Sequence, residues 1–159
     1  MCIRDSLRVV GIGTPPEELY TTSDSIRFTD LRAAGDYLAF YWRPANDYHS
    51  TRLWRSDGTA AGTVEVAGPF TYSAGDLEAV NSDARVLFIA YQSGTSKELW
   101  LADLETLVVT QLTEFKPGSN TNTVSNEIAR HADLVLVAAT DHGTNLELHA
   151  VPILSLIHI

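Results

Sequence analysis

A repeat of 46 residues is the feature that most constrains the fold. Residues 53–66 hold two short runs of aromatic and β-branched residues around Asp-Gly and Gly-Thr. This pattern is typical of a β-hairpin, because glycine supplies the positive-φ positions of its turn. The hairpin recurs, since Trp54 and Trp100 lie 46 residues apart, and segment 30–33 returns at 76–79 with the same spacing. Two separate segments therefore indicate one period.

Three longer apolar runs are expected to form the core strands, because nearly continuous apolar strands are typical of stacked sheets that bury both strand faces. The runs span residues 37–42, 85–91 and 134–139. The third repeat is offset by 49 residues, since His149 follows Trp100 at that distance. Its additional residues fall in the polar stretch 116–123, which is expected to be a surface loop.

Four short strands in a repeat of about 45 residues are typical of a β-propeller blade. A β-sandwich would not need the period, and β-branched residues with Gly-Thr turns disfavour a helical solenoid. We therefore expect an all-β fold, a partial and open β-propeller of about three four-stranded antiparallel blades with thirteen strands. The predicted units are the outer half of a preceding blade at 7–27, blades at 28–70 and 71–116, and an incomplete blade at 117–153.

The two ends of the chain differ from the repeats. Residues 1–6 and 154–159 resemble translated sequencing-adapter read-through, so we expect a non-native leader and a non-native tail. Cys2 is the one cysteine and falls in the leader. No native disulfide or thiol chemistry is therefore expected.

Charge and hydropathy exclude some functions. The 159 residues carry 11 Lys and Arg against 20 Asp and Glu, a net charge of −9. Phosphate neutralisation needs clustered Lys and Arg, so nucleic acid is not an expected partner. No apolar run approaches the ~20 residues of a membrane-spanning helix, so no membrane insertion is expected.

Two motifs carry a resemblance to known families. Residues 53–63 resemble the Glu-Leu-Trp-x-Ser-Asp-Gly-Thr-x-x-Gly-Thr repeat of large bacterial surface or secreted proteins, with Arg52 in place of Glu. Residues 99–113 resemble the blade motif of TolB-like propellers and of prolyl-oligopeptidase-type propellers, with Leu107 where that motif has Gly. The resemblance covers residues 7–153. It implies a bacterial protein that is extracellular, on the cell surface or periplasmic.

No catalytic, cofactor-binding or metal-binding residue is predicted. The sequence has no Gly-x-Ser-x-Gly elbow, no Gly-rich phosphate loop, no His-Glu-x-x-His and no cysteine ligand set. Ser56, Asp57 and Gly58 place a hydroxyl beside a carboxylate, but Asp and Gly are what hairpin turns select. We interpret these three residues as turn chemistry.

Histidine and carboxylate residues in the loops are candidate metal ligands. The two loop pairs are Asp47 with His49, and Asp141 with His142, before the third strands of non-adjacent blades. Two such pairs make a poor ligand shell, so solvated loop residues are the favoured interpretation. His131 and His149 stand where other repeats have different residues, and we interpret both as tolerated substitutions.

Other side chains are candidates for binding calcium or sugars. Residues 23–25 and 56–58 offer hard oxygen ligands but no EF-hand spacing, so acidic solvated loops are favoured. Trp42, Trp54 and Trp100 could form a sugar-stacking platform. Because Trp54 and Trp100 repeat in register, a structural role between blades is favoured.

Two functions remain open. The preferred one is a non-catalytic propeller segment of a secreted or envelope-associated bacterial protein that binds protein or glycan and contacts the remaining blades of its parent. The alternative is the regulatory propeller of a prolyl-oligopeptidase-type serine hydrolase, with the catalytic domain elsewhere. About three blades do not close a ring, so the isolated chain is expected to associate or aggregate.

Overall fold

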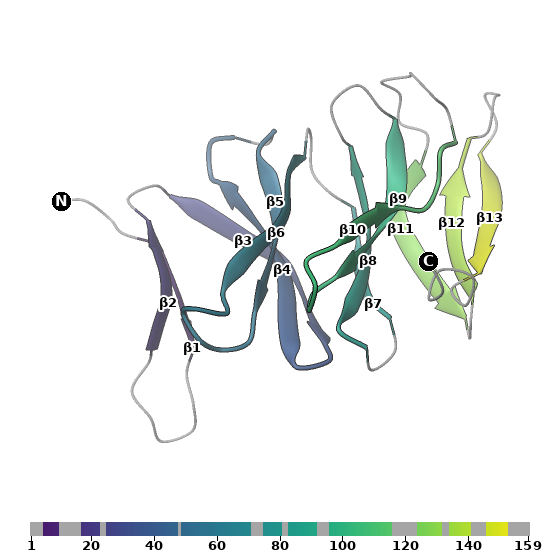
Figure 1. Ribbon diagram of the computed structural model, residues 1–159. Helices are drawn as coiled ribbons and strands as arrows, with labels where there is room; N and C mark the ends of the chain where they lie inside the picture. Colours follow the sequence, from purple (N-terminus) through teal and green to yellow (C-terminus); the bar gives the residue numbers. More distant parts are fainter. Residues whose placement is uncertain are drawn as a thin grey trace.

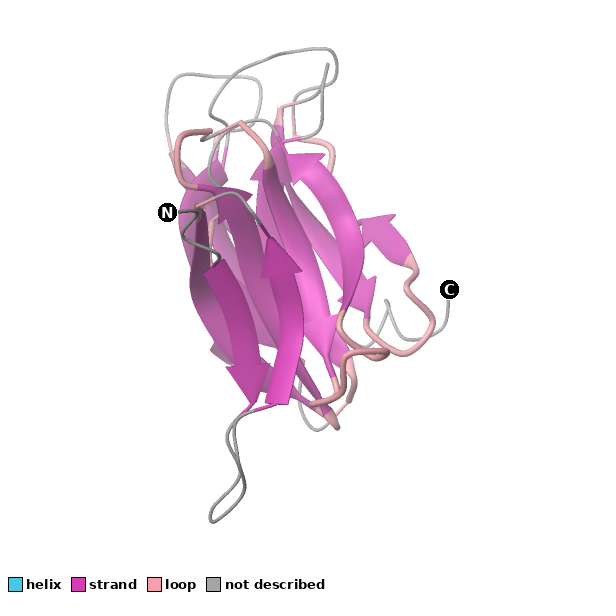
Figure 2. Ribbon diagram, turned by 90° about the vertical axis from the view of Figure 1, so that its left-hand side faces the viewer, coloured by secondary structure: helices cyan, strands magenta, loops and turns pink. Residues whose placement is uncertain are grey.

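The chain folds into a row of antiparallel sheets. The computed structural model describes residues 5–9, 17–22, 25–47, 49–70, 75–80, 83–91, 96–115, 124–131, 134–140 and 146–152. These residues form thirteen strands in four sheets and no helix, so the predicted strand number and grouping are confirmed. Figure 1 shows the sheets following one another in chain order, and Figure 2 shows them stacked behind one another from the N-terminal side.

Every sheet is a simple meander in which consecutive strands are neighbours. The first sheet holds β1 (Asp5–Val9) and β2 (Glu17–Thr22). The second holds β3 (Ile26–Ala34), β4 (Tyr37–Pro44), β5 (Thr51–Ser56) and β6 (Val64–Phe70). The third holds β7 (Leu77–Ala79), β8 (Arg85–Tyr91), β9 (Lys97–Asp103) and β10 (Val109–Gln111). The fourth holds β11 (Val124–His131), β12 (Leu134–Ala139) and β13 (Glu147–Pro152).

Apolar side chains between neighbouring sheets form two cores. In the first core, Tyr41 and Leu53 of the second sheet pack with Phe88 and Trp100 of the third. In the second core, the opposite face of the third sheet packs against the fourth, through Leu87, Leu99, Val135 and Val137 among others. The third sheet is therefore buried on both faces, which a strand rich in consecutive apolar residues predicts.

The predicted core strands differ in burial. The central five residues of β8 are all buried, as expected. In β12, by contrast, burial alternates: Val135 and Val137 are buried, whereas Leu134 is exposed. The expectation that run 134–139 is covered on both faces is wrong for the described structure, because no described strand packs on its second face.

Strand bounds and predicted unit bounds differ at two places. β3 begins at Ile26, ahead of the predicted blade start at residue 28, and contains a bulge where Asp30 has φ 52°. β1 extends into the predicted leader, since Ser6 pairs with Thr21. Cys2 and the predicted loop at 116–123 lie outside the described residues.

Candidate functional site

The turn between β5 and β6 uses its polar side chains for local hydrogen bonds. The hydroxyls of Ser56 and Thr63 share a 2.7 Å hydrogen bond, and Gly58 N donates to Ser56 Oγ at 3.1 Å. Asp57 Oδ1 accepts from the hydroxyl and the amide of Thr59, and these bonds hold the pKa of Asp57 below its usual value. Gly58 has φ +89°, which favours glycine. The predicted turn chemistry accounts for all of these groups.

The loop between β4 and β5 is organised in the same way. Asp47 Oδ1 accepts a 2.8 Å hydrogen bond from His49 N, and Asp47 Oδ2 accepts from the Ser50 hydroxyl. The Ser50 bond, followed by the His49 amide, lowers the pKa of Asp47. Its proposed counterpart, Asp141 with His142, lies outside the described residues. No group of three or more His, Cys, Asp or Glu that could hold a metal occurs in the described part of the chain.

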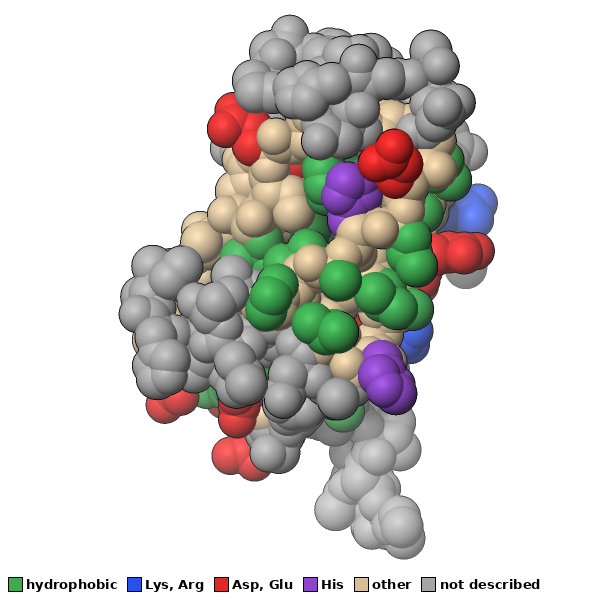
Figure 3. Space-filling model, turned by 90° about the vertical axis from the view of Figure 1, so that its right-hand side faces the viewer, with side chains coloured by type: hydrophobic (Ala, Val, Ile, Leu, Met, Phe, Trp, Pro, Cys, Tyr) green, Lys and Arg blue, Asp and Glu red, His purple; other side chains and the backbone are tan. Residues whose placement is uncertain are grey.

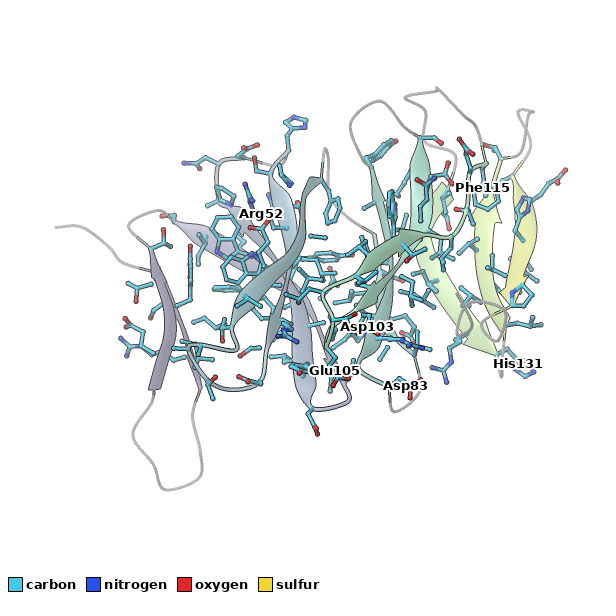
Figure 4. All side chains as sticks on the ribbon, in the orientation of Figure 1. Arg52, Asp83, Asp103, Glu105, Phe115 and His131 are labelled. Atoms are coloured by element: carbon cyan, nitrogen blue, oxygen red, sulfur yellow. The ribbon has the colours of Figure 1, made fainter. Side chains whose placement is uncertain are left out.

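The two further candidate histidines, His131 and His149, do not meet. His149 packs against Phe115 with ring centroids 4.7 Å apart, and its Nε2 is buried without a hydrogen-bond partner. His131 is exposed at the end of β11, at the opposite end of the sheets from Phe115 (Figure 4). His149 thus takes a packing position equivalent to that of Trp100, and the two histidines form no common site.

Of the three residues considered for calcium at 23–25, only Ser25 is described. Its carbonyl accepts a 2.7 Å hydrogen bond from Ala45 N, which closes the end of the β3–β4 pair. The other two residues, Ser23 and Asp24, lie outside the described part of the chain.

The tryptophans have packing roles. Trp100 stacks on Phe88 at 6.4 Å, and its Nε1 donates to Ala90 O at 3.2 Å. Trp54 lies 5.1 Å from Tyr20 of β2 and 6.2 Å from Trp42. Both repeated tryptophans therefore contact aromatic rings, and Trp54 also joins two sheets. The three tryptophans do not form one platform, because Trp100 is buried between the second and third sheets.

A buried carboxylate that no sequence motif marked as functional fixes the segment after β10. Glu98 is 1% exposed and accepts hydrogen bonds from the Ser96 hydroxyl, from Thr113 Oγ1 at 2.8 Å and from Phe115 N at 3.1 Å. Buried charge is tolerated when it is hydrogen-bonded in this way. The Glu of the repeat motif is thus structural here. In the second sheet, Arg52 replaces it and pairs with Glu65 at 2.9 Å on a partly exposed surface (Figure 4).

A cavity of about 330 Å³ lies between the first sheet and the turns of the second. Its wall is mostly apolar, and charged side chains stand among the lining residues. The lining comprises Leu7, Arg8, Leu19, Gly35, Asp36, Tyr37, Leu38, Ser56, Asp57 and Gly58. The guanidinium of Arg8 is paired with Glu18 at 3.2 Å. A small apolar group with a polar end fits such a wall.

The cavity lies beside a position at which the repeats differ. Asp57-Gly58 of the second sheet corresponds to Asp103-Leu104 of the third, 46 residues later. The Leu104 side chain is fully buried in the core between the second and third sheets. A Cβ added at Gly58 would meet no atom within 4 Å. The space beside Gly58 is therefore open where the next repeat carries an aliphatic side chain.

Antiparallel sheets, two of them four-stranded, are stacked in chain order without helices among the described residues, and they define an all-β partial and open β-propeller. No family model and no curated protein matches the sequence. Among solved structures, a puromycin hydrolase mutant complexed with PGG is similar, with a TM-score of 0.59 and 9% identity over 88% of this chain. The match covers 21% of that hydrolase, and the matched region is a propeller domain, so the likeness shows the fold. In the described part of the chain, no helix has the length and apolar character needed to cross a membrane.

Proposed function

We propose that this chain is a non-catalytic propeller segment that binds protein, as part of a secreted or envelope-associated bacterial protein. The observation that carries the proposal is the cavity beside Gly58. Its leucine-rich wall suits an aliphatic side chain of a partner better than a sugar, whose hydroxyls need many hydrogen-bond partners. The bacterial envelope assignment rests on the resemblance of residues 53–63 to surface-protein repeats.

A titration with N-acetyl-leucinamide tests the proposal, with N-acetylglucosamine as the glycan probe. We expect amide NMR shifts at Gly58 and Leu38 with the leucine probe and none with the sugar. Leu38→Phe enlarges a lining residue and is expected to weaken probe binding at least fivefold. Leu31→Phe is the matched control, because Leu31 is 50% exposed and does not line the cavity. Shifts with the sugar alone, or with neither probe, contradict protein binding at this cavity.

A second candidate function is the regulatory propeller of a prolyl-oligopeptidase-type hydrolase. The structural similarity to a puromycin hydrolase favours it, since that protein carries a propeller of similar fold. The uninterrupted gene separates the two candidates. An α/β-hydrolase sequence fused to these blades supports the regulatory propeller, and a complete reading frame without one supports the binding segment.

A further inference from the structure

Two acidic residues line the cavity beside Gly58, in addition to its apolar wall. Asp36 lies in the turn between β3 and β4, Asp57 lies in the turn after β5, and both are exposed. Hydrogen bonds from Thr59, with a smaller effect from Arg55, hold the pKa of Asp57 below its usual value, so its carboxylate is charged near neutral pH. Neither carboxylate forms an ion pair within the described part of the chain.

The basic side chains near the cavity are held by other groups. Arg8 lines the cavity, and its guanidinium donates to Glu18 Oε2 at 3.2 Å. The guanidinium of Arg55 lies over the ring of Tyr37, 4.5 Å from its centroid, and donates to a backbone carbonyl of the third sheet. The two carboxylates at the cavity are therefore left without a paired cation from these side chains.

The third sheet carries a cation at the corresponding position. Asp103 follows Asp57 by 46 residues, and its Oδ2 accepts a 3.1 Å hydrogen bond from Arg85 Nε. Arg85 faces Asp103 across the β8–β9 pair. In the second sheet, the register of β4 with β5 continues to place Tyr37 opposite Asp57. The carboxylate of Asp57 thus has an aromatic residue across from it where the next repeat has an arginine.

Two side chains of the third repeat, aliphatic Leu104 and cationic Arg85, have no counterpart at the cavity. We propose that the cavity binds a protein segment in which an aliphatic residue is directly flanked by lysine or arginine. The aliphatic side chain enters the space beside Gly58, and the cation lies at the carboxylates of Asp36 and Asp57. The net charge of −9 favours the same partner. This inference rests on the proposed function and adds the charge of the partner to it.

Three peptides test the inference: N-acetyl-leucyl-lysine amide, N-acetyl-leucyl-glutamine amide and N-acetyl-leucyl-glutamate amide. They differ chiefly in the charge beside the leucine. Affinity is measured from the amide NMR shifts of Gly58 and Leu38 during titration. At low ionic strength, we expect the lysine peptide to bind about threefold more tightly than the glutamine peptide, and the glutamate peptide to bind more weakly than both. Salt screens exposed charges, so the three affinities should converge in about 0.5 M NaCl.

Asp36→Asn and Asp57→Asn each remove one charge from the cavity and keep the size of the side chain. Each variant should lower the ratio of the lysine-peptide affinity to the glutamine-peptide affinity. Asp36→Asn keeps the test informative where Asp57→Asn disturbs its turn. Glu147→Gln is the matched control and should leave the ratio unchanged, because Glu147 is exposed on the fourth sheet and does not line the cavity. Figure 3 shows acidic side chains around hydrophobic ones on that side too, so the control tests whether any such charge has the same effect.

The outcomes separate this inference from the proposed function. Equal affinities for the three peptides at low ionic strength overturn the inference and leave the proposed function standing, because leucine alone then accounts for binding. A lysine preference that both asparagine variants retain in full also overturns it. Amide shifts with none of the three peptides contradict protein binding at this cavity, and the inference then fails together with the proposed function.

Discussion

Leu107 occupies a backbone conformation that suits glycine. Its φ of +62° lies in the left-handed region, which costs a residue with a Cβ about 1 kcal/mol or more. The TolB-like blade motif has Gly at this position, and the side chain here is 39% exposed. The departure from the motif therefore introduces strain with little burial in return.

Leu107→Gly should accordingly raise the free energy of unfolding by about 0.5–1 kcal/mol. The variant gains stability because the backbone strain is relieved, and it loses part of this gain because glycine is more flexible in the unfolded chain. Denaturant unfolding measures it. Leu107→Ala is the control, because alanine keeps the Cβ and the strain. If the alanine variant is as stable as the glycine variant, backbone strain is not the cause.

Lys97 is buried on β9, and burial lowers its pKa to about 8. Between pH 8 and about 10.5, the unfolded chain keeps a proton that the folded chain has lost, so stability rises with pH through this window. Below pH 8 the cost of the buried charge is constant. The expected rise is on the order of a few kcal/mol.

Lys97→Met should abolish this rise and increase stability at pH 7. The measurement is the difference in unfolding free energy between the parent chain and the variant from pH 7 to 10.5. The difference is needed because Tyr41 also makes stability depend on pH. Burial raises the pKa of Tyr41, so near pH 10 this tyrosine ionises in the unfolded chain and not in the folded chain, and stability falls. This effect is common to both proteins and cancels in the difference. If the difference in unfolding free energy does not change with pH, the rise in stability does not come from Lys97.

At the scale of elements, two similar strands have different surroundings. Leu87 of β8 and Leu136 of β12 occupy the same repeat position, but only Leu87 lies between two sheets. Leu87→Ala should therefore cost about 2–5 kcal/mol, and Leu136→Ala less than about 1 kcal/mol. Thermal or denaturant unfolding of the paired variants checks this. Similar losses at both positions would mean that the open face of the fourth sheet, which bears Leu134, Leu136 and Leu148, is covered in solution.

The strands themselves could be predicted from the sequence because local pattern and repeat agree. Short runs of aromatic and β-branched residues, Gly-containing turns and the 46-residue spacing each indicate the same hairpins, and the spacing groups them into sheets. Burial of β12 on both faces could not be predicted correctly. Its apolar run resembles that of β8, and what covers a strand depends on another module and not on the strand.

The candidate site was less accessible to sequence reasoning. The role of Asp57 followed from turn preferences, since short side chains cap nearby amides. Asp47 was predicted only to be a solvated loop residue, and its hydrogen bonds to His49 N and Ser50 are seen in the structure alone. The cavity beside Gly58 was missed, although one signal was present: comparison with Leu104 shows an aliphatic residue missing from one repeat. Glu98 was missed because its partners, Thr113 and Phe115, meet it only in the folded sheet.

At the scale of the whole molecule, the open face governs association. Leu134 and Leu148 expose apolar surface, and Leu148 stands at the repeat position of Leu99, which is buried between the third and fourth sheets. Contiguous exposed apolar surface promotes association, and free strand edges add backbone pairing. We expect the average mass of the purified chain to rise with concentration without reaching a single defined oligomer, as measured by light scattering after size exclusion.

The double variant Leu134→Lys with Leu148→Lys should suppress this increase of mass with concentration. Two lysine side chains keep the open face hydrated and repel the same face of another molecule. Both side chains are exposed, so the double variant should unfold with nearly the same free energy as the parent chain. The control is the double variant Arg27→Leu with Arg32→Leu, which exchanges cation and leucine in the opposite direction at two exposed positions of β3. This control variant should not reduce association. A parent chain that stays monomeric at all concentrations contradicts the argument, since the open face would then be compatible with water.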